Sequence, residues 1–337
     1  MRNLRSFLVF HPALWGLIVL QSLVIAAWIA IDPRLSFSAA NATDLLTLCA
    51  TCVVIALIAY ACRATRWPVA AERVGVMVMG ILFLTLAFAG ARFLNYLSMS
   101  SALPMADDLL DSWDKALGLD WHAYATRLSR YPDILPYLQD SYSRATLLIT
   151  YVFLVLAAFG RTERAKEFVT LLYIGVVLTI GIAGFFPADG AMARYVDDHL
   201  LASFGPKTGV YFVEALKSVR EAKDFTLSFA HLPGLASFPS YHTIIALLIV
   251  YAWRDNIVTL LLAGTGGGLI LLGTPVYGGH YFVDVIAGFF VTAVLAFAYM
   301  AIRSANSRAP EIVTREPFLG LRRFWIAHPS SKGLDAG

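Results

Sequence analysis

Charged residues are scarce in this 337-residue chain: they make up 15% of it, whereas soluble proteins carry about 25%. Together with a mean hydropathy of +0.68, this scarcity excludes an ordinary soluble domain. The chain instead contains apolar runs long enough to cross a bilayer as helices. We predict an all-α integral membrane protein with about eight transmembrane helices, in contact with the lipid bilayer. The predicted spans are residues 8–31, 44–62, 74–97, 144–160, 167–187, 240–254, 257–275 and 283–302.

Cysteine is also rare, and its three copies all fall in the second apolar run. This placement predicts no disulfide framework. Cys49 and Cys52 have the spacing of a redox or metal pair, but inside an apolar span without further ligands helix packing is the favoured interpretation. Gly264 and Gly268 belong to a glycine-rich stretch that lacks the Lys-Ser/Thr ending of a phosphate-binding loop. Their spacing favours close helix packing instead.

Basic residues are distributed in a pattern that predicts the topology. The net charge is only +3, and the charges act as topology determinants, so no nucleic-acid partner is predicted. Under the positive-inside rule the basic loops face the cytoplasm. Both termini are then cytoplasmic, in a multi-pass protein of the inner membrane if the cell is bacterial, and segments 98–143 and 188–239 are external. The basic residues are Arg63, Arg66, Arg73, Arg161, Arg164, Lys166, Arg254, Arg303, Arg308, Arg315, Arg322 and Arg323.

The chain divides into three predicted parts. Residues 1–73 form a two-helix membrane anchor, residues 74–303 a six-helix catalytic membrane domain, and residues 304–337 a cytoplasmic tail. In the external segment 98–143, apolar residues recur at helical spacing beside acids and tryptophans. This pattern suits amphipathic helices on the outer membrane surface, with Trp113 and Trp121 at headgroup level. A solvated outer loop is the alternative.

Two histidines and a carboxylate stand where apolar runs begin or end, and ionisable groups there are usually functional. His242 and His280 are 38 residues apart, which is about 57 Å of helix, or two membrane crossings. Both histidines are therefore predicted on the same side of the membrane. His280 and Asp284 are four apart and share a helix face.

The three side chains together predict phosphoryl transfer through a covalent phosphohistidine. Asp284 can accept a hydrogen bond from one ring nitrogen of His280, which leaves the other nitrogen as nucleophile or base. Ser240 is an N-cap candidate at a helix start that favours phosphate, and His242 can protonate the leaving oxygen. A metal site, a haem held by His242 and His280, and a transporter are the alternatives; no internal repeat supports a transporter.

At these residues the chain resembles the type 2 phosphatidic acid phosphatase superfamily. Pro239-Ser-Tyr-His242 is similar to its Pro-Ser-x-His motif, and His280-x-x-x-Asp284 to the end of its third motif. The resemblance implies a six-span core with His280 as nucleophile, Asp284 orienting it, and His242 as acid and then base. It implies no metal or other cofactor.

Departures from the phosphatase pattern point to one branch of that superfamily. Thr274 stands where the third motif has arginine, and the Lys-x6-Arg-Pro motif is absent near Pro187. Residues 238–242 and 279–284 are more similar to inositolphosphotransferases such as inositol phosphorylceramide synthases. This branch implies transfer of a phosphorylated headgroup from a phospholipid or isoprenoid-phosphate substrate; hydrolysis to free phosphate is the alternative. Phosphate-binding candidates are Ser240, Arg92, Arg144 and Arg194.

Overall fold

The computed structural model describes residues 9–38, 40–63, 68–228 and 232–308. The chain separates into a unit over residues 1–299 and a second unit from Met300 onward, of which only the last residues of one helix are described. The architecture and the site belong to the first unit. Arg66 and most of the predicted cytoplasmic tail lie outside the described residues.

Among the residues that the structure describes, six helices are long and apolar enough to cross a membrane. They are α2 (Pro12–Ile31), α3 (Ala40–Arg63), α4 (Pro68–Met99), α9 (Thr162–Ala183), α14 (Ile257–Tyr277) and α15 (Phe282–Arg308). Two further helices, α7 (Leu135–Ser143) and α8 (Ala145–Ala158), meet at a bend of 65° and together count as a possible seventh span.

The all-α membrane architecture is therefore confirmed, whereas the count of eight spans is not. The predicted run 240–254, the sixth in chain order, forms α13 (Tyr241–Ala252), an apolar helix of only 12 residues. At about 1.5 Å per residue it measures roughly 18 Å, which is shorter than the hydrocarbon core of about 30 Å.

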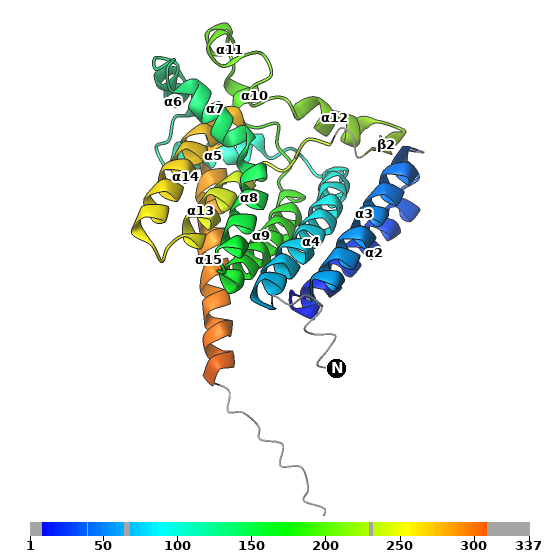
Figure 1. The fold of residues 1–337 in the computed structure, drawn as a ribbon. Helices are drawn as coiled ribbons and strands as arrows, with labels where there is room; N and C mark the ends of the chain where they lie inside the picture. The colour runs from blue at the N-terminus through cyan, green and yellow to red at the C-terminus, as the bar shows by residue number, and fades with distance from the viewer. Residues whose placement is uncertain (1–8, 39, 64–67, 229–231, 309–337) are drawn as a thin grey trace, which may run out of the picture. The chain divides into compact units, whose positions relative to one another are not determined.

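Helix α4 is the centre of the bundle, in contact with α2, α3, α8 and α9 (Figure 1). Its inward face packs aromatic and aliphatic side chains such as Phe83 against Phe153 and Tyr173. The outer helices instead expose apolar side chains, among them Leu46 on α3 and Phe297 on α15. Apolar residues on both faces are typical of helices surrounded by lipid.

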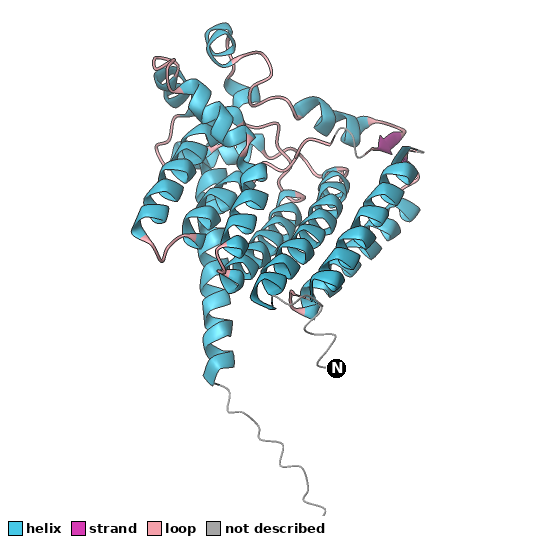
Figure 2. Cartoon of the chain, in the orientation of Figure 1, coloured by secondary structure: helices cyan, strands magenta, loops and turns pink. Residues whose placement is uncertain are grey.

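The shorter helices gather at one end of the bundle, which we call the loop end (Figure 1). They are α5 (Asp107–Ala116), α6 (Trp121–Leu128), α10 (Ala191–Tyr195), α11 (Asp198–Phe204) and α12 (Val213–Glu221). A two-stranded parallel pair, β1 (Leu35–Phe37) and β2 (Phe225–Leu227), joins the residues after α2 to those after α12 (Figure 2).

Two local predictions were wrong. Trp121 does not face the lipid headgroups, because it is buried in the protein and its indole N–H donates to the Pro275 carbonyl at 3.1 Å. Gly264 and Gly268 are not the close-packing glycines, since a Cβ at either position would meet nothing within 4 Å. Gly267 has that role: a Cβ there would lie 2.9 Å from Val250 of α13.

Candidate active site

The first site element is the start of α13. Ser240 is its N-cap, as predicted, and its hydroxyl accepts the backbone N–H of Thr243 at 3.4 Å. This cap ends the loop at residue 240 and places His242 in the first turn of the helix. The free N–H groups of a helix start favour an anion nearby.

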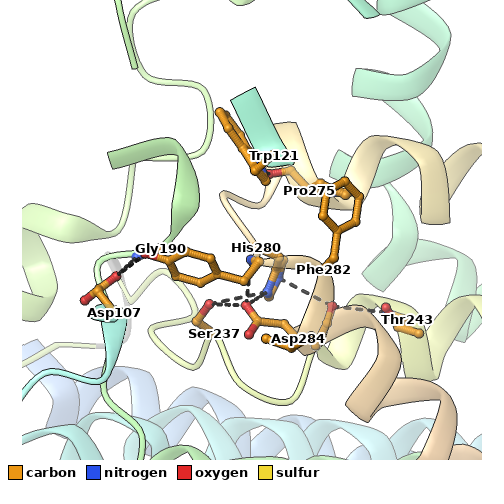
Figure 3. Close-up of polar contacts among 12 residues, drawn as sticks. Asp107, Trp121, Gly190, Ser237, Thr243, Pro275, His280, Phe282 and Asp284 are labelled. Carbon is orange, nitrogen blue, oxygen red and sulfur yellow. Dashed lines mark hydrogen bonds and ion pairs between the residues drawn. The ribbon is translucent and has the colours of Figure 1, made fainter. Parts of the chain in front are cut away.

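The second site element is the turn from α14 into α15, which carries His280 and Asp284. Asp284 Oδ2 accepts hydrogen bonds from His280 Nδ1 at 3.1 Å, from the Ser237 hydroxyl at 2.7 Å and from the Tyr281 backbone N–H at 3.0 Å (Figure 3). Both His280 and Asp284 are buried. A neutral imidazole that donates from Nδ1 carries its lone pair on Nε2. That nitrogen lies 3.5 Å from the Ser240 hydroxyl.

The two histidines meet, as their separation along the chain predicts. Their ring centroids are 6.4 Å apart and the rings are inclined by 62°. Both side chains line one cavity of about 1030 Å³. A phosphorus atom in this cavity can therefore be reached by one imidazole while the other serves the leaving oxygen.

Two tyrosines that the sequence reasoning missed stand beside His242. The ring of Tyr142, from α7, stacks on His242 with centroids 4.0 Å apart. Its hydroxyl lies 3.3 Å from that of Tyr211, and both tyrosines line the cavity. A Cβ built on Gly278 would lie 2.5 Å from His280 Cδ2 and 2.7 Å from the Tyr142 hydroxyl, so both groups approach one point. No spacing pattern marks either tyrosine in the sequence.

The lining of the cavity is partly polar and partly apolar. The polar lining includes the histidines, the tyrosines and two cationic side chains, Arg92 and Lys207. The apolar part runs along one face of α4 and is completed by α8 and α9; its lining includes Ile81, Leu84, Phe88, Ile149, Val176 and Ile180.

Of the three arginines predicted to bind phosphate, only Arg92 lines this cavity. Arg144 is largely exposed and pairs with Asp140 at 3.0 Å. Arg194 pairs with Asp108 at 2.8 Å and with Asp111 at 3.4 Å. Lys207, which we did not predict as a phosphate ligand, supplies the second cation of the cavity.

Glycines allow three loops to meet beside the histidines. Gly279 has φ of +68° and Gly190 has φ of +90°, values that side chains other than glycine rarely adopt. The Ala191 N–H donates to the Gly279 carbonyl at 2.7 Å. A Cβ on Gly279 would lie 2.2 Å from the Gly209 carbonyl oxygen. Steric crowding therefore requires glycine at position 279, the first residue of the Gly-His-Tyr-Phe-Val-Asp stretch.

Across the described part of the chain, no group of three or more His, Cys, Asp or Glu side chains is arranged to hold a metal ion. The functional groups of the site are two imidazoles, a carboxylate, hydroxyls and two cations. A nucleophile oriented by a carboxylate beside a second proton-transfer group is the arrangement that covalent catalysis requires.

Comparison with known proteins shows the family to which the chain belongs. The family model of the PAP2 superfamily matches residues 108–298, which is more than half of the chain. The match runs from α5 into α15 and includes both histidines and Asp284, whereas α2, α3 and α4 fall outside it. No curated protein and no solved structure matches the chain.

Proposed function

Because the chain belongs to the PAP2 superfamily, and is thus a phosphatase or phosphotransferase of the type 2 phosphatidic acid phosphatase kind, we propose that it transfers a phosphorylated headgroup between lipids. The donor is a lipid phosphate ester, either a phospholipid or an isoprenoid phosphate. The reaction passes through a phosphohistidine. The observation that carries this proposal is the meeting of His242 and His280 in one cavity with a long apolar wall, with Asp284 hydrogen-bonded to His280 behind it.

In the first half-reaction His280 Nε2 attacks phosphorus while the bond from phosphorus to the donor's alcohol oxygen breaks. His242, which takes up a proton when the phosphate anion binds beside it, gives that proton to the oxygen, so the lipid alcohol leaves neutral. Asp284 accepts the Nδ1–H of His280 and stabilises the positive charge that the ring gains on phosphorylation.

In the second half-reaction His242 removes the proton of an incoming alcohol, whose oxygen attacks phosphorus. The bond from nitrogen to phosphorus breaks and its electron pair returns to His280 Nε2. Water in place of the alcohol gives hydrolysis, so the acceptor alone separates a transferase from a phosphatase.

Negative charge on the phosphate oxygens needs fixed donors and cations. We assign this role to Arg92 and Lys207, together with Ser240 at the start of α13. Arg144 and Arg194 have no part in this assignment, because both are engaged in ion pairs away from the cavity lining. Thr274, at the position of the phosphatase arginine, is buried and donates to the Ile270 carbonyl at 2.7 Å.

Transfer is the favoured reaction because of the motif resemblance and the altered cation set, and the apolar wall along α4 supports a lipid donor. We further propose that the termini are cytoplasmic and that the loop end, with the active site, faces outward. The distribution of arginine between the two sets of loops supports this orientation.

The test is an assay of purified protein with phosphorylated lipids, with and without lipid alcohols as acceptors. We expect headgroup transfer that requires the acceptor, and an acid-labile, base-stable phosphoenzyme. His280→Ala should abolish both, whereas His199→Ala, a matched change at an exposed residue of α11, should leave them intact. If the sole product is free phosphate, or the free phosphorylated headgroup, the reaction is hydrolysis and not transfer. Turnover in His280→Ala would remove the nucleophile assignment.

A further inference from the structure

Helix α5 turns two of its acids, Asp111 and Asp114, into the protein, whereas Asp108 is exposed. Asp111 and Asp114 are buried, the latter 2% exposed, while the neighbouring Leu109 and Trp113 are 43% and 37% exposed. A helix on a membrane surface or in a solvated loop normally exposes its acids. Burial of a charged group is costly unless it is hydrogen-bonded or paired, so Asp111 and Asp114 must have partners inside the loop end.

Asp114 accepts hydrogen bonds from the first two backbone N–H groups of α15. The Phe282 N–H lies 2.9 Å from Asp114 Oδ2 and the Val283 N–H lies 2.8 Å from Oδ1. The first N–H groups of a helix have no partner within the helix and usually bond to the side chain of the N-cap residue. The residue before α15 is Tyr281, whose hydroxyl donates instead to Asp107. Asp114 thus supplies from α5 the cap that Tyr281 does not provide.

The other half of this cap is Asp284. Its Oδ2 accepts the Tyr281 N–H, as the third residue of a helix does in a capping box, and the same oxygen accepts Nδ1–H of His280. The first turn of α15 consequently fixes the carboxylate that orients the nucleophile. Asp114 holds the same turn through its first two N–H groups.

Helix α5 also contacts the other loops of the site. Asp107 accepts the backbone N–H groups of Asp189 and Gly190 at 3.0 and 2.9 Å (Figure 3). The ring of Trp113 lies 5.9 Å from that of Phe238, two residues before the N-cap Ser240. One short helix therefore bridges the segments that carry His242 and His280.

We propose that Asp114 is a positioning residue of the active site, which holds the start of α15 so that Asp284 aims His280 Nε2 at phosphorus. This inference rests on the proposed function. Burial raises the pKa of Asp114 to about 6. The hydrogen bonds from the two N–H groups lower this pKa, and the nearby charges of Asp284 and Asp111 raise it. The carboxyl is thus ionised at neutral pH and accepts both hydrogen bonds.

Asp114→Asn tests the proposal, because the amide has the same size but only one acceptor oxygen for the two N–H groups. We expect kcat to fall about 10- to 100-fold, the cost of a displacement of the reacting groups by about 1 Å. KM should stay unchanged, because no contact with the substrate is lost. The matched control is Asp108→Asn on the same helix: its side chain is 93% exposed, and kcat should not change.

The kinetic constants are expressed per folded molecule, measured by size-exclusion profile and melting temperature. A loss of folded protein with normal kcat per folded molecule would show a purely structural cap and overturn the proposal. Wild-type kcat in Asp114→Asn, with His280→Ala inactive, would also overturn it and leave the proposed function standing. Turnover in His280→Ala would refute the function itself. If Asp114→Asn does not fold, Asp114→Ser, with one acceptor in a smaller side chain, is expected to show the same selective loss of kcat.

Discussion

The apolar wall of the cavity predicts how turnover depends on the length of the substrate tail. Along α4 the part of the lining between Arg92 and Ile81 is about 16 Å long at about 1.5 Å per residue. A carbon chain advances roughly 1.25 Å per bond, so this wall can cover about 13 carbons. Burial of each methylene contributes about 0.8 kcal/mol, or about a fourfold rise in kcat/KM.

This rise applies to substrates dissolved as monomers in water, because a tail that starts in lipid gains nothing by entering an apolar wall. Thr85 lines the cavity between the two ends of the wall. Thr85→Trp should block the wall about 10 Å from Arg92, beyond roughly eight carbons. With a ten-carbon substrate, the two excluded methylenes should lower kcat/KM about 15-fold relative to the wild type.

The assay measures alcohol release from phosphate esters with tails of increasing length, below their micelle concentration. We expect kcat/KM of the wild type to rise up to about 13 carbons and that of Thr85→Trp to level off near about eight carbons. Thr265→Trp is the matched control, because Thr265 is exposed on α14 and does not line the cavity. If kcat/KM rises by the same factor per added carbon in Thr85→Trp and in the wild type, the placement of the tail along α4 is refuted.

Three further predictions follow from the contacts around the histidines. Ser237→Ala removes the 2.7 Å hydrogen bond to Asp284 and should lower kcat roughly tenfold at constant KM; an unchanged kcat in steady-state kinetics would show that Asp284 is held without it. Gly279→Ala should lower the melting temperature, because the left-handed conformation costs at least about 1 kcal/mol and the new Cβ would lie 2.2 Å from the Gly209 carbonyl oxygen; a melting curve identical to that of the wild type would contradict this. Burial raises the pKa of Asp114 from 3.8 to about 6, so this carboxyl stabilises the fold below its unfolded pKa and loses that contribution as pH rises through about 6. The melting temperature of the wild type should therefore fall relative to that of Asp114→Asn between about pH 4 and about pH 7, and parallel pH profiles would exclude the shift.

Much of the helical architecture could be predicted because hydrophobicity is a local property. Each predicted apolar run contains a helix, since a backbone in lipid must satisfy its hydrogen bonds within the segment. The contact between His280 and Asp284 could also be predicted, because a spacing of four residues places two side chains on one helix face. The N-cap role of Ser240 could be predicted because it is the polar residue directly before an apolar run.

The contacts of α5 could not be predicted in this way. Asp114 and Phe282 are separated by 168 residues, and an amphipathic pattern does not show which face of a helix will be buried. The burial of Trp121 has the same origin, because its partner, the Pro275 carbonyl, belongs to a distant helix. Long-range contacts of this kind leave no periodic signal in the chain.

Composition and short-range spacing were sufficient to establish a helical membrane protein, the start of α13 and a histidine oriented by an acid one turn away. They could not distinguish the cations of the site from the others. Arg92, Arg144 and Arg194 look alike in a sequence, yet only Arg92 lines the cavity, where Lys207 accompanies it. The difference arises because a cation binds substrate only if no nearer carboxylate engages it, and the packing of helices far apart in the chain determines which carboxylates are near.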